Sequence, residues 1–176
     1  MQTAKRSPIV MTIGHSSRTI DEFIHLLQLH ETTLVIDVRT IPHSRHNPQF
    51  NKNILPVSLS AVKIDYLHMM ELGGLRHTSG SSVNNAWRNA SFRGYADYMQ
   101  TPQFQKAIEK LIRLAQGDRV VLMCAETVPW RCHRSLIEDA LIIRGISCED
   151  IISSSSYQTH SLTSFAKVNG TKITYP

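Results

Sequence analysis

The stretch Val120-Val121-Leu122-Met123-Cys124-Ala125-Glu126 decides how this chain folds. Its apolar run is typical of a buried β-strand, and the run stops at a cysteine and a carboxylate. A short loop with Pro129 follows, and residues 132–144 then have helical spacing that Gly145 closes. Open α/β sheets bind ligands where strands of this kind give way to helices. The stretch therefore predicts an α/β sheet with a site at its edge.

The segments before this stretch alternate between strand and helix patterns. Residues 9–13 and 34–38 are short runs rich in β-forming side chains. Between them, Thr19 and Glu22 have the spacing of a helix capping box, and an apolar stripe at helical spacing follows. Strand, helix and strand in this order predict a βαβ unit with parallel strands.

The rest of the chain continues this alternation and then changes character. The expected elements are helices at 53–62, 95–99 and 102–115, strands at 64–67, 119–124 and 147–152, and a long loop at 73–89. We expect the serine run 153–156 to be a solvated linker, and Asn169-Gly170 predicts a hairpin with a type I′ turn. We therefore predict a single domain over residues 1–176. It combines an α/β three-layer sandwich with a mostly parallel sheet (1–152) and an appended segment with a β-hairpin (153–176).

The composition limits the class of protein. A chain of 176 residues with 41% hydrophobic content suits one globular domain, and no apolar run approaches the ~20 residues that span a bilayer. The start of the chain carries Lys5 and Arg6 but only a brief apolar stretch, so we expect no signal peptide, no membrane partner and a cytoplasmic location. The net charge of +5 permits an anionic partner without requiring one. Three cysteines, an odd number, predict reduced thiols.

Reactive or charged side chains follow three of the predicted strands. Because the carboxyl ends of parallel strands meet at one edge of a sheet, we expect these side chains to share one crevice. The predicted catalytic residues are Cys124, Glu126, Cys132 and His133. The predicted substrate-binding residues are His15, Ser16, Asp37, Arg39, Arg45 and Arg134.

The residue types in this group suggest a thiol chemistry on an anion. Cys124 or Cys132 would be the nucleophile or redox thiol, and Cys132, in the first turn of the predicted helix, would have its pKa lowered by the helix dipole. Glu126 or His133 would move protons. Guanidinium groups suit phosphate and carboxylate, so the arginines are predicted to clamp a small anionic substrate.

Several residues also have a structural interpretation. Asp37 can simply pair with a nearby arginine, His15 can serve only in a turn, and Cys124 can be a small core residue. A phosphatase or rhodanese loop has the same order of strand, cysteine, loop and helix. Here, however, Arg131 comes seven positions after Cys124, which is longer than the phosphatase spacing of five intervening residues, and Pro129 removes one amide donor, so this alternative is disfavoured. No CxxC pair, Walker A motif or GxGxxG motif occurs, so we assign no metal ligand and name no cofactor.

Seven short motifs run in order along the chain, and their combination is specific. They are Thr12-Ile13-Gly14-His15-Ser16, Asp37-Val38-Arg39, Ser44-Arg45, Leu72-Gly73-Gly74, Phe92-Arg93-Gly94-Tyr95-Ala96-Asp97-Tyr98-Met99, Met123-Cys124-Ala125-Glu126 and Cys132-His133-Arg134. In these motifs the chain resembles the domain-of-unknown-function family number 488. The resemblance implies an α/β fold and a shared polar site, and it supplies no activity. The predicted hairpin lies outside these motifs.

Three functions compete at this point. The first is an enzyme whose thiol, carboxylate and arginine site binds a small anionic substrate. The second is a non-catalytic nucleotide or nucleic-acid binding module, suggested by the positive charge and by aromatic residues beside Arg88 and Arg93 that could stack on bases. These aromatic residues are Trp87, Phe92, Tyr95 and Tyr98. The third is an interaction module in which the polar cluster is a structural network.

Overall fold

The fold is built on one six-stranded sheet with the strand order β3-β2-β4-β1-β5-β6. The structure, a computed structural model, describes residues 7–176, so the prediction drawn from Lys5 and Arg6 lies outside the described residues. The strands are β1 (Ile9–Gly14), β2 (Leu34–Asp37), β3 (Asp65–His68), β4 (Val120–Cys124), β5 (Ser147–Ser153) and β6 (Ser156–Thr159). Only β6 is antiparallel to its neighbour, so the predicted mostly parallel sheet is confirmed.

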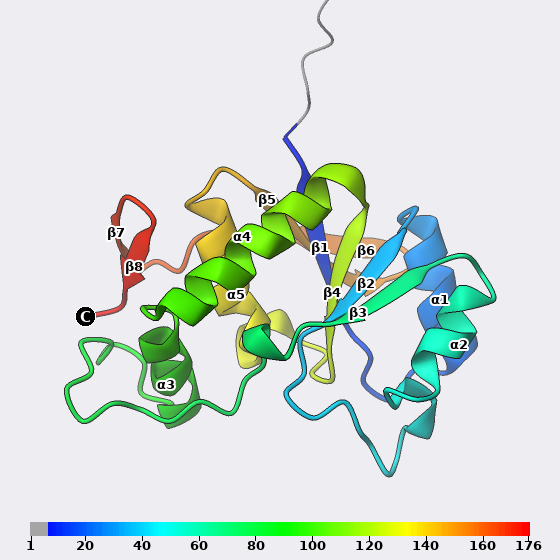
Figure 1. Cartoon of the computed structure of the whole chain (residues 1–176), viewed down its shortest axis with the longest axis horizontal. Coiled ribbons are helices and arrows are strands. Elements are labelled where there is room, and N and C mark those ends of the chain that lie inside the picture. The colour runs from blue at the N-terminus through cyan, green and yellow to red at the C-terminus, as the bar shows by residue number, and fades with distance from the viewer. Residues whose placement is uncertain (1–6) are drawn as a thin grey trace, which may run out of the picture.

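Helices cover both faces of the sheet and give the predicted three layers (Figure 1). Helices α1 (Ile20–Leu29) and α2 (Leu55–Ser60) lie on one face, and α4 (Pro102–Gly117) and α5 (Arg134–Ile142) lie on the other. From β1 the chain passes to β2 and then to β3 at one edge of the sheet. It then turns back, crosses β2 to form β4, and crosses β1 to form β5. Right-handed crossovers in opposite directions place helices on opposite faces, which accounts for this division.

Side-chain alternation in β4 decides which way its cysteine points. Val121 and Met123 belong to the core beneath α1 and α2, whereas Val120, Leu122 and Cys124 belong to the core beneath α4 and α5. Successive side chains of a strand point to opposite faces, so this register follows directly from the sequence. The last residue of β4 therefore presents its thiol toward α5.

The helix boundaries follow local signals in the sequence. The capping box predicted from Thr19 and Glu22 is present at α1, and Thr101 caps α4 with Pro102 in its first turn. Gly145 has a φ of +79° just after α5, as expected for a C-terminal glycine. The helix predicted at 95–99 is α3 (Ala90–Tyr98), which begins earlier because the Asn89 side chain accepts hydrogen bonds from two N–H groups of its first turn.

Two predictions for the end of the chain were wrong in detail. The serine run is not a linker, because Ser156 begins β6, an exposed edge strand whose polar side chains give no hydrophobic alternation. The predicted hairpin is present as β7 (Lys167–Asn169) and β8 (Lys172–Thr174), but its two loop residues are Gly170 and Thr171. Of these only Gly170 has a positive φ, +63°, which fits a type II′ turn rather than type I′.

Three short 3-10 helices complete the described part of the chain. They are η1 (Pro48–Phe50), η2 (Met70–Leu72) and η3 (Pro129–Arg131). The C-terminal hairpin lies beside α3 and the start of α4 (Figure 1), where the Gln100 side chain donates to the Ile173 carbonyl at 2.6 Å. Among residues 7–176, no helix is long and apolar enough to cross a bilayer.

Candidate active site

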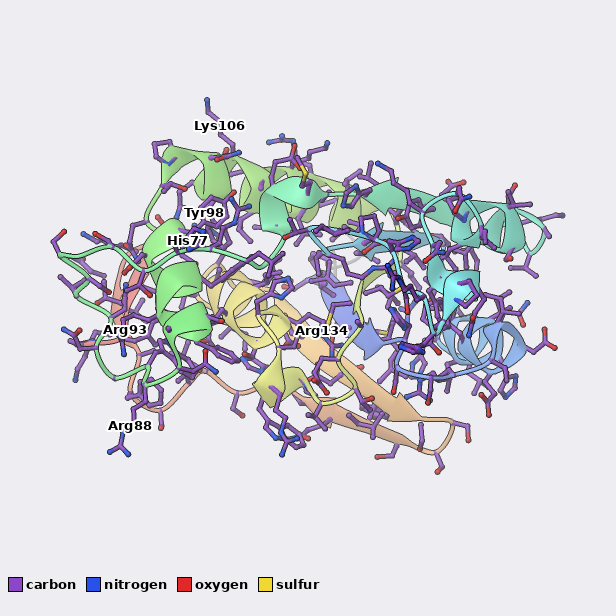
Figure 2. The ribbon with its side chains drawn as sticks, turned by 90° about the horizontal axis from the view of Figure 1, so that it is seen from below. His77, Arg88, Arg93, Tyr98, Lys106 and Arg134 are labelled. Carbon is purple, nitrogen blue, oxygen red and sulfur yellow. The ribbon has the colours of Figure 1, made fainter. Side chains whose placement is uncertain are left out.

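A cavity of about 770 Å³ opens at the carboxyl edge of the sheet, where β1, β2 and β4 end. Figure 2 views the molecule from this edge, with Arg134 near the middle. Two non-glycine residues that line the cavity, Ser16 and Leu75, have positive φ angles of 48° and 58°. Such backbone strain is concentrated at functional sites in proteins, so it supports a functional role for this cavity.

The end of β1 and the loop after β4 are in close contact. The backbone N–H groups of His15 and Ser16 donate to the carbonyls of Cys124 and Ala125, at 2.9 and 3.0 Å. A Cβ on Gly14 would lie 1.9 Å from the Glu126 carbonyl oxygen, so only glycine allows the loop to pass. The cavity wall is therefore fixed by backbone contacts.

Two cysteine thiols meet in the wall of the cavity. Cys124 ends β4, Cys132 follows η3, and their Sγ atoms lie 2.7 Å apart. Helix α5 begins at Arg134, two residues later than predicted, so Cys132 precedes the helix instead of lying in its first turn. Its backbone is extended, and its sulfur accepts a hydrogen bond from the Arg134 N–H at 3.5 Å, as a capping side chain does.

His133 is oriented so that it can take a proton from Cys132. Its Nε2 lies 2.9 Å from the Val38 carbonyl oxygen, and a carbonyl can only accept, so Nε2 carries a proton. Its Nδ1 faces the Cys132 sulfur at 3.6 Å. Gly74 makes room for the ring, since a Cβ at that position would lie 3.2 Å from Nδ1.

The pKa values of the two thiols are shifted in opposite directions. Burial opposes ionisation of Cys132, but the hydrogen bond from Cys124, the contact with His133 and the charge of Arg134 outweigh it and lower the pKa of Cys132 well below its usual value. Burial and the neighbouring Cys132 sulfur raise the pKa of Cys124 well above its usual value. The pair therefore holds one negative charge on Cys132, with Cys124 as the proton donor.

Asp37, Arg39 and His15 form a buried network beside the cysteines. The Arg39 guanidinium donates two hydrogen bonds to Asp37, at 2.9 and 2.6 Å, and one to the Phe50 carbonyl at 2.7 Å. The Tyr66 hydroxyl also donates to Asp37, at 2.6 Å. The structural interpretation of Asp37 thus holds, because the carboxylate is paired with an arginine.

His15 is the neutral member of this network. Burial and the charge of Arg39 outweigh a backbone hydrogen bond to Ser16 and lower the pKa of His15 to about 4. Its Nδ1 lies 2.8 Å from the Ser16 carbonyl, and its Nε2 lies 3.3 Å from Arg39 Nη1. With its ring stacked on Phe50 at 4.3 Å, His15 positions Arg39 and carries no charge at neutral pH.

Arg134 is buried behind the cysteines. It is 1% exposed, and it donates to the Thr12 hydroxyl at 3.1 Å and to the Glu126 carbonyl at 2.6 Å. Among residues 7–176 no carboxylate oxygen lies within 4.0 Å of it. A buried arginine without a carboxylate partner favours a negative charge nearby, and the Cys132 thiolate provides one.

The structure brings most of the predicted site residues together. The cavity is lined by His15, Ser16, Arg39, Cys124, Glu126, Cys132 and His133. Three predicted residues do not line it: Asp37 and Arg134 lie beneath the surface, and the exposed Arg45 is next to the lining residue Ser44 without lining the cavity itself. Of the three arginines predicted to clamp the substrate, Arg39 lines the cavity. The exposed Arg131, which directly precedes Cys132, also lines the cavity.

The aromatic residues near Arg88 and Arg93 serve mostly in packing. The hydroxyls of Tyr95 and Tyr98 donate to backbone carbonyls at 2.8 and 2.6 Å, and both rings are buried. Trp87 stacks on Phe92 with 4.9 Å between ring centroids and also packs against Phe165 and Tyr175. Figure 2 shows Arg88 pointing outward, away from Arg134.

Fold and site together define an α/β protein with an open sheet and a two-cysteine cavity at its carboxyl edge. The family described as Domain of unknown function DUF488 matches residues 19–141, and the chain belongs to this family. This confirms the resemblance drawn from the seven motifs. No curated protein and no solved structure matches the chain.

Proposed function

We propose that this protein is a thiol-dependent enzyme that acts on a small anionic substrate, with Cys132 as its nucleophile. One observation carries the proposal: Cys132 lies in the cavity wall between a proton donor, Cys124, and a proton acceptor, His133. A structural cysteine gains nothing from a lowered pKa, whereas a nucleophile needs its thiolate form at neutral pH.

The arrangement accounts for every proton in a displacement reaction. His133 Nδ1 accepts the proton of the Cys132 thiol, and the thiolate attacks an electrophilic atom of the substrate. A sulfur–substrate bond forms while the leaving group departs with its electron pair and takes the proton back from His133. The protonated Nδ1 keeps its orientation because Nε2 stays bonded to Val38.

The charge around the cavity favours an anion. Arg131 is exposed at the cavity, and Arg39 also lines it, although Asp37 balances the charge of Arg39. Glu126 is the opposing charge in the lining. We infer that Arg131 attracts the anionic group of the substrate.

Alkylation kinetics test the nucleophile. Iodoacetamide at neutral pH is expected to label Cys132 first and to leave Cys148 unlabelled, because burial raises the pKa of Cys148 far above its usual value. Cys132→Ser should abolish the fast phase, and the matched variant Cys148→Ser should leave it unchanged. Fast labelling that survives Cys132→Ser would overturn this assignment.

A second pair of reagents tests the preference for anions. Iodoacetate carries a carboxylate and iodoacetamide does not, so the ratio of their rates at Cys132 reports the charge preference of the cavity. Arg131→Gln is expected to lower this ratio about two- to fivefold, because a contact with an exposed charge contributes up to about 1 kcal/mol. Inorganic phosphate should slow labelling of the wild type, and a ratio unaffected by Arg131→Gln would remove the anionic substrate from the proposal.

The binding-module alternative makes a different prediction. Binding of single-stranded oligonucleotides that weakens with salt and persists in Cys132→Ser would favour it. The burial of Tyr95 and Tyr98 supports the enzyme instead, because a stacking platform needs exposed rings.

A further inference from the structure

A second group of titratable side chains comes from α5, β5 and the segment after β6, and it is joined to Arg134 through Thr12. The Thr12 hydroxyl accepts from Arg134 and donates to Asp150 on β5. Beside Asp150 lie Glu138 of α5 and His160, which follows β6. One ligand atom from each of these three residues lies within 4.8 Å of the others.

Glu138 has no hydrogen-bond partner in this group. Its side chain is fully buried, and within residues 7–176 neither carboxylate oxygen accepts a hydrogen bond. A buried carboxylate without a partner is costly, and such groups in proteins are normally paired or coordinate a metal. Burial and the neighbouring Asp150 carboxylate raise the pKa of Glu138 well above its usual value, and a cation that contacts both oxygens would take the place of the proton.

The orientation of His160 supplies an independent observation. Its Nε2 lies 2.8 Å from Asp139 Oδ1, and Asp139 also accepts from the Thr163 N–H and the Tyr175 hydroxyl, so it acts as an acceptor throughout. Nε2 therefore donates, and Nδ1 is left facing Glu138 Oε2 at 3.6 Å. In the neutral imidazole this nitrogen presents a lone pair to a carboxylate, and a cation between the two atoms would satisfy both.

We propose that Glu138, Asp150 and His160 bind a divalent transition-metal ion. Zinc-type bonds of about 2.1 Å in a tetrahedron put neighbouring ligand atoms ~3.4 Å apart, so the observed 3.6 Å between His160 and Glu138 needs little adjustment. Asp139 holds the other nitrogen of His160, which is how proteins fix the orientation of a metal-binding histidine. A cavity of about 330 Å³ lined by Asp150 and His160 gives access from solvent and room for water as a fourth ligand.

The ligand types select the class of ion. One imidazole and two carboxylates suit Zn²⁺, Mn²⁺, Fe²⁺ or Co²⁺, whereas a soft ion prefers the thiols of Cys124 and Cys132. The ion would tie α5, β5 and the segment after β6 together. Because the family match ends at residue 141, Asp150 and His160 lie outside the part of the chain that matches.

Cobalt titration of the full chain tests the site, because Co²⁺ reports both its geometry and its ligands. We expect about one Co²⁺ per chain, with visible bands typical of four or five ligands and without the near-ultraviolet band of a cobalt–thiolate bond. Glu138→Gln and His160→Ala should remove binding, and Asp139→Asn should weaken it about 10- to 100-fold. The matched controls Glu149→Gln, on the same strand as Asp150, and His25→Ala, exposed on α1, should bind as the wild type does.

Each other outcome overturns the proposal. A thiolate band that disappears in Cys132→Ser would place the ion at the cysteines. Absence of binding, with folding verified by circular dichroism, would show that Glu138, Asp150 and His160 hold no ion. If Glu138→Gln fails to fold, His160→Ala still tests metal binding. His160 lies at the cavity on an irregular segment, so its replacement is expected to leave the fold intact. None of these results depends on whether Cys132 is a nucleophile.

Discussion

Cys124→Ala is the perturbation that tests the ionisation of the cysteine pair most directly. In the wild-type protein the Cys124 S–H donates to the Cys132 sulfur across 2.7 Å, and this hydrogen bond is one of the interactions that lower the pKa of Cys132. Cys132 still faces His133 in the variant, and Arg134 still lies nearby. The pKa of Cys132 should therefore rise without returning to its usual value.

The size of the rise follows from the kind of bond removed. A hydrogen bond to a charged group contributes about 1.5–3 kcal/mol, and a thiol is a weak donor, so the lower end applies. At 1.36 kcal/mol per pKa unit, removing the bond raises the pKa of Cys132 by about 1 unit. Both thiols are almost fully buried, so solvent screens little of this effect.

The assay is the rate of iodoacetamide alkylation at Cys132 as a function of pH. The midpoint of this profile should move upward by about 1 pH unit in Cys124→Ala. It should stay in place in Cys148→Ala, which removes a buried thiol outside the cavity. A midpoint that stays fixed or moves downward in Cys124→Ala would show that Cys124 is not the donor.

The same ionisation must appear in the stability of the protein. The folded pKa of Cys132 lies below its unfolded value near 9, so the unfolded chain binds the extra proton between these two pKa values. The stabilisation is fully present above about pH 9 and is lost as the pH falls through the folded pKa. Urea unfolding across this range should show this pH dependence in the wild type and lose it in Cys132→Ser.

Three further predictions concern the framework of the site. Because the folded pKa of His15 is about 4, the unfolded chain binds an extra proton between about pH 6.5 and 4. The free energy of unfolding should therefore fall by up to ~3 kcal/mol as the pH is lowered through this range. Urea unfolding of His15→Gln should not show this loss. Gly14→Ala forces a Cβ against a backbone carbonyl, so thermal unfolding should show a loss of about 1–3 kcal/mol, while Gly80→Ala, with open space around it, should change stability by less than about 0.5 kcal/mol. Tyr66→Phe removes a donor from the buried Asp37 carboxylate and should cost about 1–3 kcal/mol in urea unfolding; an unchanged midpoint would mean that the bond contributes nothing.

Local signals in the sequence predicted those parts of the fold that depend on neighbouring residues. The capping box of α1 and the thiol at the end of β4 depend on residues within a few positions of each other, and the structure has both. The edge strand β6 was missed because it pairs through backbone groups while its side chains stay exposed. Hydrophobic alternation, the usual sequence signal for a strand, is absent from such a segment.

The candidate site was predictable in its location but not in the direction of its side chains. Topology brings the ends of β1, β2 and β4 together, so His15, Asp37 and Cys124 were expected to be neighbours. Whether an arginine faces a cavity or the core depends on contacts distant in sequence. Arg134 illustrates this, because its partner Thr12 is 122 residues away. Nothing local to His160 indicates that it meets Glu138, since they approach only after β5 and β6 have paired.

Arg134 lies between the cysteine pair and the group of Glu138, Asp150 and His160. Because it is buried, its charge acts on both with little screening by solvent. Its guanidinium has no carboxylate within ion-pair distance in the described part of the chain, so its charge must be balanced at longer range. The charges of the Cys132 sulfur and, beyond the Thr12 hydroxyl, of Asp150 both favour the charged form of Arg134. A cation bound at Asp150 would offset the negative charge of that carboxylate. The positive charge of Arg134 would then stabilise the Cys132 thiolate more strongly. Occupancy of the proposed metal site and acidity of Cys132, the proposed nucleophile, would then be linked through a single buried side chain, because both act on the same charge.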